Sequence, residues 1–111
     1  MVNYEPLDRT FSALADPTRR RIVERLARRA MTVGEIAKDF PISQPAISKH
    51  VRVLENSGLL RREVAGRIHY CTLSPAAMAG AVQWIERQRK YWNASLDRLQ
   101  SVISNESKKR K

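Results

Sequence analysis

The chain is poor in cysteine and has no long apolar segment. Cys71 is the only cysteine among the 111 residues, so the chain has no internal disulfide and gives no sign of an oxidising compartment. No apolar run approaches the roughly 20 residues that a helix needs to cross a bilayer. No charged segment followed by an apolar one opens the chain, as it would in a secretory signal. We therefore expect a cytoplasmic protein that has no membrane partner.

Acidic residues are also scarce. The 21 lysines and arginines outnumber the 11 aspartates and glutamates, and the formal net charge of +10 indicates a polyanionic partner. The acids are scattered over charged helices, and we find neither a nucleophile with a base nor paired carboxylates, so we expect no enzyme. The hydrophobic content of 42% suits one small domain over residues 1–105. We expect residues 106–111, which are rich in lysine and arginine, to form a disordered basic tail.

Two short helices joined by a tight turn are predicted in the middle of the chain. Thr32 is placed to cap the first helix, and Glu35 is placed to return the hydrogen bond in a capping box. Pro41 interrupts the chain, Ser43 can cap a second helix, and Gly58 can end it. Two helices this close together suggest a helix-turn-helix.

The second of these helices separates into an apolar and a polar side. Ile47, Val51 and Leu54 recur at helical spacing and form one apolar stripe. The opposite side and the N-terminal end carry no carboxylate. The residues there that we expect to face DNA are Ser43, Gln44, Pro45, Ser48, Lys49 and Arg52. Amide, hydroxyl and ammonium groups of this kind pair with base edges and phosphates. The alternative is a polar face that is only solvated.

A basic hairpin follows this helix. Two extended segments are joined by a turn in which Gly66 can adopt a positive φ. Arg62 and Arg67 flank the tip, from which two guanidinium groups can reach phosphates or the minor groove. We expect Ile68 and Tyr70 to face inward. The expected fold class is therefore mainly α with a small β-hairpin, a winged helix-turn-helix.

The helix that precedes the motif is crowded with arginine. Asp16 is placed to cap it, and Pro17 is suited to its first position. The arginines on or beside this helix are Arg19, Arg20, Arg21, Arg25, Arg28 and Arg29. Such a run is usually a solvated face, and direct phosphate contact by one of them is the alternative. The macrodipole slightly disfavours cations at a helix N-terminus, so the presence of Arg19 and Arg20 there hints at a use.

A long helix with an apolar seam is predicted from a cap at Ser74 to about Ile103. Its apolar residues recur at alternating spacings of four and three, as in a heptad repeat. The members of this seam are Met78, Val82, Ile85, Arg89, Trp92, Leu96, Leu99 and Ile103. Arg89 needs either a position at the edge of the seam or a carboxylate partner, for which Glu86 and Asp97 are both candidates. One small domain is not expected to cover so much apolar surface, which indicates a dimer. The alternative is that the seam packs on the first helix of the same chain.

Three stretches of the chain together resemble the ArsR/SmtB family of winged-helix repressors. They are ALADPTRRRIVERLA at 13–27, SQPAISKHVRVLENSGLL at 43–60 and GRIHYCTL at 66–73, and the likeness spans nearly the whole chain. The resemblance implies that Arg62 and Arg67 contact DNA from the wing. It also implies that the recognition-helix segment contains Ser43, Gln44, Pro45, Ser48, Lys49 and His50.

The resemblance further implies a two-fold dimer built by the first and last helices. The interface residues expected on these helices are Leu7, Phe11, Val82, Ile85, Arg89, Trp92, Leu96 and Leu99. Such a dimer would bind an inverted repeat with half-sites about one helical turn apart, roughly 34 Å or a multiple of it, and would block a promoter. We therefore expect a sequence-specific DNA-binding repressor. Two alternatives are a non-specific basic nucleic-acid-binding protein and a module whose long helix binds another protein.

Many members of this family sense metal ions, and this sequence lacks the groups that do so. The family uses a Cys-x-Cys pair in the first helix of the motif, or Asp, His and Glu pairs on the last helix, and neither is present. Cys71, His69 and His50 do not make the ligand set of a zinc site. We expect no metal and no cofactor. Cys71 is expected to be a small strand hydrophobe, His69 an exposed strand residue, and His50 a neighbour of a phosphate.

Overall fold

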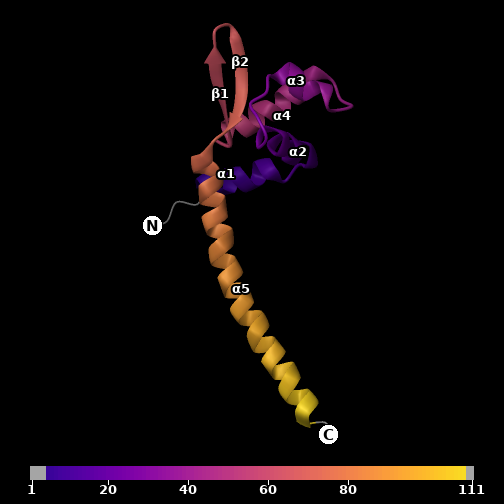
Figure 1. Cartoon of the computed structure of the whole chain (residues 1–111), viewed down its shortest axis with the longest axis vertical. Helices are drawn as coiled ribbons and strands as arrows, with labels where there is room; N and C mark the ends of the chain where they lie inside the picture. Colours follow the sequence, from indigo (N-terminus) through magenta and orange to yellow (C-terminus); the bar gives the residue numbers. More distant parts are fainter. Residues whose placement is uncertain (1–4, 110–111) are drawn as a thin grey trace. The chain divides into compact units, whose positions relative to one another are not determined.

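The computed structural model describes residues 5–109, and along this stretch a series of helices is interrupted by one hairpin (Figure 1). The elements in chain order are α1 (Glu5–Leu14), α2 (Pro17–Leu26), α3 (Val33–Lys38), α4 (Gln44–Asn56), β1 (Leu60–Ala65), β2 (Ile68–Leu73) and α5 (Pro75–Lys109). The chain divides into two units, one ending at Ala81 and one beginning at Val82. The predicted mainly helical fold with a small hairpin is confirmed.

The predicted helix starts are confirmed by their capping hydrogen bonds. Thr32 Oγ1 accepts from Glu35 N at 3.1 Å, and Glu35 Oε1 accepts from Thr32 N at 3.1 Å, which completes the capping box of α3. Ser43 Oγ accepts from Ala46 N at 3.3 Å at the start of α4. Each cap satisfies backbone N–H groups that the helix itself leaves without a partner. The two helices of the predicted helix-turn-helix therefore each begin at the capping residue that the sequence indicated.

Two arginines of α2 close the end of the preceding helix. Arg19 Nε donates to Ala13 O at 2.7 Å, and Arg20 Nη1 donates to Leu14 O at 2.9 Å and to Ala15 O at 3.0 Å. These carbonyls at the end of α1 have no partner inside that helix, and basic side chains near a helix C-terminus are favoured by its dipole. The role of Arg19 and Arg20 is thus to join α1 to α2.

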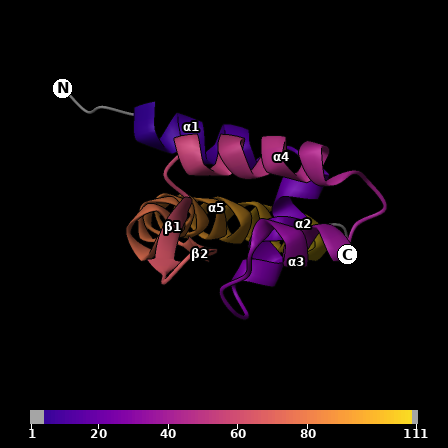
Figure 2. The same ribbon diagram turned by 90° about the horizontal axis from the view of Figure 1, so that it is seen from above.

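The core of the first unit surrounds the buried side of α4. Ile47, Val51 and Leu54 each have no exposed surface, which confirms the predicted apolar stripe. α4 packs against α1, α2, α3 and β1 (Figure 2). The remaining core residues are Ala13, Ile22, Val23, Leu26, Met31, Ile36, Leu59, Leu60 and Cys71. Because these four elements all pack on one side of α4, its opposite side is left facing solvent.

The hairpin has the predicted strands but not the predicted facing. β1 and β2 pair antiparallel, and Gly66 turns the chain with φ of 66°. Ile68 was expected to face inward together with Tyr70, but Ile68 is 48% exposed while Cys71 is fully buried. Met31 explains the difference, because its backbone forms a bridge to Cys71 with N–H···O distances of 3.2 and 2.7 Å. Successive side chains of a strand point to opposite faces of the sheet. Because Cys71 faces the core, Ile68, three residues away, lies on the opposite face.

The burial of Cys71 agrees with the prediction of a small strand hydrophobe. Burial also raises the pKa of its thiol, since the charged thiolate is poorly solvated there. The raised pKa keeps the group protonated and unreactive at neutral pH.

α5 is longer than predicted. It was expected to end near Ile103 and continues to Lys109, so it includes residues 106–109, which were expected to belong to a disordered tail. No glycine or proline follows Gly80 in the sequence to end the helix. Arg110 and Lys111 lie outside the described residues. None of the helices in the described range combines the length and apolarity that a membrane span requires.

Candidate nucleic-acid interface

The outward side of α4 forms a shallow basic hollow. Its lining residues are Gln44, Pro45, Ser48, Lys49 and Arg52. All five were predicted from the sequence to face outward, and they lie together because the opposite stripe of α4 is buried. Within residues 5–106 neither Lys49 nor Arg52 has a carboxylate within ion-pair distance. The hollow therefore offers amide, hydroxyl, ammonium and guanidinium groups to an anionic, hydrogen-bonding partner.

Ser43 lies next to the hollow and has a defined structural role. It is exposed, but its hydroxyl accepts the Ala46 N–H as the cap of α4. A hydroxyl oxygen that already accepts one hydrogen bond can still donate its own proton. Ser43 can thus reach a partner at the N-terminal end of the hollow without giving up the cap.

His50 points away from the hollow. Its Nδ1 atom lies 3.8 Å from Asp16 Oδ2, at the N-terminus of α2. The Arg19 N–H donates to the Asp16 carboxylate at 3.0 Å and, with the neighbouring His50, holds the pKa of Asp16 below its ordinary value. The sequence placed His50 near a phosphate, whereas the structure places it between α4 and α2. The reason is its spacing of three from Ile47 and one from Val51, which brings it toward the buried side.

The two predicted wing arginines have different surroundings. Arg67 lies in the turn of the hairpin, is exposed, and has no ion-pair partner among the side chains that the structure describes. Arg62 lies nearer the base of the hairpin, where its Nε is 3.1 Å from Glu55 Oε2 of α4. Arg67 is therefore available to a partner, and Arg62 is already engaged by a carboxylate.

Glu55 is the residue whose contribution the sequence reasoning missed. It is the single acid of α4 and lies near the C-terminal end of the helix, outside the basic hollow. Its partner Arg62 is seven residues further along and lies on a strand, so no helical spacing relates the two. Opposite charges on either side of the turn at Gly58 were the only signal that could have suggested the pair.

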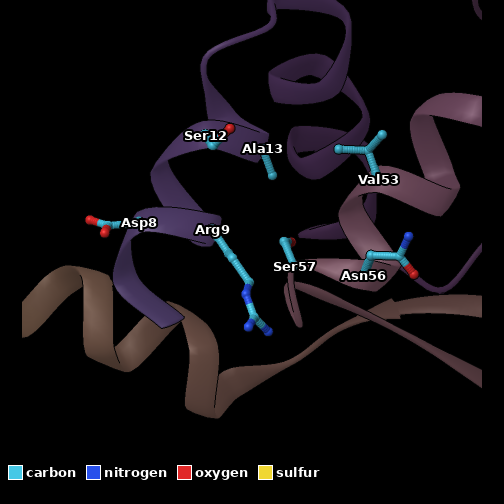
Figure 3. A pocket seen from close by; sticks show the side chains of 7 residues that line it. All are labelled: Asp8, Arg9, Ser12, Ala13, Val53, Asn56 and Ser57. Atoms are coloured by element: carbon cyan, nitrogen blue, oxygen red, sulfur yellow. The ribbon is translucent and has the colours of Figure 1, made fainter. Parts of the chain in front are cut away.

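A second hollow lies between α1 and the C-terminal end of α4 (Figure 3). Its lining residues are Asp8, Arg9, Ser12, Ala13, Val53, Asn56 and Ser57. Figure 3 shows side chains reaching it from both helices, with Asp8 pointing outward from α1. It shares no lining residue with the basic hollow. Arg9 at its edge is paired with Glu5.

The predicted dimer residues differ in exposure between the two helices. Leu7 and Phe11 of α1 are half-buried. On α5 the exposed fractions run from 48% to 62% for Val82, Ile85, Trp92, Leu96 and Leu99. Arg89 Nη2 lies 2.9 Å from Glu86 Oε2, so the partner of this seam cation is Glu86 and not Asp97. The seam is thus apolar, with its one cation neutralised from the same helix.

Candidate metal ligands are dispersed in the described part of the chain. No three side chains of His, Cys, Asp or Glu gather there at a spacing suited to an ion. Cys71 is buried in the core, and His50 is next to Asp16.

Comparisons with known proteins agree on the family. A family model described as a helix-turn-helix domain matches residues 14–63. The chain is 39% identical over 106 residues to the HTH-type transcriptional regulator Rv2034 of Mycobacterium tuberculosis, with 96% of each chain covered. It is 33% identical over 79 residues to the transcriptional repressor SdpR of Bacillus subtilis, covering 71% of this chain and 88% of that protein.

A solved structure supports the same assignment. The crystal structure of an ArsR family transcriptional regulator has 38% sequence identity and a TM-score of 0.72, and the match covers 80% of this chain and 98% of that one. The likeness extends from the helix-turn-helix to the wing and beyond, as the sequence motifs had indicated. The chain therefore belongs to the ArsR/SmtB family of winged helix-turn-helix transcriptional regulators.

Proposed function

We propose that this chain represses transcription by binding, as a homodimer, to an inverted repeat in double-stranded DNA. The observation that carries the proposal is the basic hollow on the outward side of α4. It contains no carboxylate, and within residues 5–106 its two cations have no carboxylate within ion-pair distance. A helix of this kind fits the major groove, where an outward face reads the edges of the bases. The formal net charge of +10 favours a polyanion in the same way.

Each residue of the hollow has a chemical part in this proposal. Gln44 at the start of α4 pairs through its amide with adenine, because the amide matches the donor and acceptor on that base. Lys49 donates to guanine or to a phosphate, and Arg52 to a phosphate. Ser48 donates to a base or to the backbone. Pro45 fills space beside the groove without competing for a hydrogen bond.

The wing adds contacts that do not depend on sequence. Arg67 at the hairpin turn is exposed and basic, and guanidinium groups at such positions bind phosphates or enter a narrow minor groove. His50 has no part in this contact, because it is turned toward Asp16.

A second copy of the chain is the proposed partner of α5. The side chains of Val82, Ile85, Trp92, Leu96 and Leu99 present apolar surface along one seam of the helix. Removing such apolar surface from water favours association. Leu7 and Phe11 of α1 are proposed to complete the interface. Another protein's helix would also suit this seam, and the mass of the protein in solution separates the two: a heterologous partner predicts a monomer.

Repression follows from where such a dimer would sit. A two-fold dimer that occupies both halves of an inverted repeat covers the promoter and excludes the polymerase. We propose that the protein acts in the cytoplasm, where it meets the DNA. SdpR, to which the chain is similar, is named a repressor.

Selection of bound duplexes from a random pool tests the proposal. We expect an enriched inverted repeat whose half-site centres lie about 10 base pairs apart or a multiple of that spacing. The binding constant for the enriched duplex should fall steeply with salt, because the protein displaces counterions from phosphates. A pool without enrichment, with equal binding to single strands, would instead indicate a non-specific nucleic-acid-binding protein.

A further inference from the structure

We propose that Arg62 is a positioning residue: through Glu55 it holds the wing against the recognition helix, and it does not itself bind phosphate. The proposal rests on the proposed function, since it concerns how the two DNA-contacting parts are kept in register. It assigns a role to Glu55, the only carboxylate of α4.

The geometry of the pair differs from that of a surface ion pair. Arg62 Nε lies 3.1 Å from Glu55 Oε2, and the two side chains are 35% and 36% exposed. The neighbouring wing pair, Arg61 with Glu63, is 3.7 Å apart and 61% exposed on each side. Arg62 and Glu55 thus join two different elements at hydrogen-bond distance, whereas Arg61 and Glu63 join two residues of one strand.

The strand register explains why Arg62 reaches α4. Arg62 is paired with Cys71 across the hairpin, and Cys71 is fully buried against the core. Paired residues lie on the same face of a two-stranded sheet, so Arg62 extends on the side of the hairpin that faces the helices. Beyond this point residues 63–69 are all exposed. Among the hydrogen bonds and ion pairs of residues 5–106, this ion pair is therefore the one that ties the wing to α4.

Charge gives a second argument. A carboxylate on a recognition helix repels phosphates, so by electrostatics alone Glu55 opposes the proposed function. The Arg62 guanidinium neutralises it at close range. Because the pair is neutral overall, it attracts a polyanion only weakly. Its contribution is to fix the position of the hairpin relative to α4. Fixing Arg67 relative to the basic hollow before binding lowers the cost of ordering both parts on DNA.

Four single glutamine variants of the full chain, and a double variant at Glu55 and Arg62, test the proposal against the selected duplex. Glu55→Gln removes one partner's charge and keeps the shape of the side chain, and Arg62→Gln removes the guanidinium and leaves a shorter polar side chain. Glu63→Gln is the matched control, because it removes the same charge from the wing without touching the tie. Arg67→Gln is the reference for loss of a phosphate contact. Dissociation constants are measured at several salt concentrations, and thermal unfolding is followed for each variant to establish that it is folded.

The expected result is a paired loss. Glu55→Gln and Arg62→Gln should each weaken binding about three- to fivefold, the range of a modest ion pair, with an unchanged salt slope. The double variant should lose no more than either single one, since both act through one contact. Glu63→Gln should bind as well as the natural chain or slightly better. Arg67→Gln should reduce the salt slope by about 1.

Opposite results would overturn the proposal. If Arg62 bound phosphate, Arg62→Gln would reduce the salt slope as Arg67→Gln does, and Glu55→Gln would strengthen binding by removing a repulsive charge. If the pair served only the stability of the fold, both variants would melt earlier and bind DNA with unchanged affinity. If the natural chain selects no duplex, the proposed function fails and this inference fails with it, whereas a bound duplex with independent losses rejects the inference alone.

Discussion

The helices α4 and α5 are both amphipathic, but the apolar side is buried in α4 and exposed in α5. In α4 the apolar stripe of Ile47, Val51 and Leu54 is fully buried and the polar side faces solvent. In α5 the seam from Val82 onward leaves about half or more of each large apolar side chain exposed. The chain itself covers the apolar side of α4, because α1, α2, α3 and β1 all pack on it.

This difference in burial distinguishes an apolar surface that the chain covers by itself, on α4, from an apolar surface that we propose a second copy covers, on α5. A buried stripe with a basic outward side presents a polar surface to an anion, and α4 is built this way. An exposed apolar seam is costly in water and is typical of a helix that associates with another. The proposed assignment of DNA to α4 and of a second copy to α5 follows from these opposite arrangements, and each can be broken separately.

The largest effect is expected from a charge in the α5 seam. Leu96→Glu would place two carboxylates in the proposed dimer interface, each costing at least about 2 kcal/mol, so association should weaken by about 4 kcal/mol or more. Sedimentation should show a monomer. Ser101→Glu, which adds the same charge outside the seam, should remain a dimer. An unchanged mass for Leu96→Glu would argue against the seam as the interface.

A slightly smaller effect is expected from the buried stripe of α4. Ile47→Ala removes methyl groups from a side chain with no exposed surface and should lower the free energy of unfolding by about 3 kcal/mol, as for other large-to-small core changes. Chemical denaturation measures this directly. Val53→Ala, on the exposed side of the same helix, is the control and should change stability far less. Equal losses at both positions would contradict the burial difference.

The outward side of α4 should affect specificity and not stability. Gln44→Ala is expected to cost about 1–3 kcal/mol of binding at one base position and to leave the other positions unchanged. Arg67→Ala should weaken binding to all sequences nearly equally, because a phosphate contact carries no sequence information. Competition between single-base variants of the selected duplex measures both. Equal, sequence-independent losses would count against base readout by Gln44.

The smallest effect concerns the acid side of the stability profile. The Arg19 N–H and, less strongly, His50 keep the pKa of Asp16 below its ordinary value of 3.8. A carboxyl whose pKa is lowered by folding stabilises the fold above its unfolded pKa, and this stability is lost as the pH falls through the folded pKa. We expect Asp16→Asn, which keeps a capping oxygen, to flatten the decline of the melting temperature below about pH 4. An unchanged profile would mean that Asp16 does not contribute to it.

Much of the local structure was predictable because its causes are local. A cap such as Thr32 or Ser43 acts on a backbone N–H three residues away, and the spacing of Ile47 to Leu54 is enough to orient α4. The five residues of the basic hollow follow from that orientation. By contrast, the facing of β2 was predicted wrongly, since Ile68 and Cys71 are both apolar and alternation alone does not choose between them.

The sequence by itself thus determined where α2, α3, α4, α5 and the hairpin begin, which side of α4 faces outward and which family the chain resembles. Only the tertiary structure decided that Cys71 enters the core, that His50 meets Asp16, that Arg62 meets Glu55, and that Arg19 and Arg20 close α1. The physical reason is the range of the interactions. Caps and periodic stripes depend on neighbours within one or two turns, whereas these contacts join separate elements and exist only once those elements have packed.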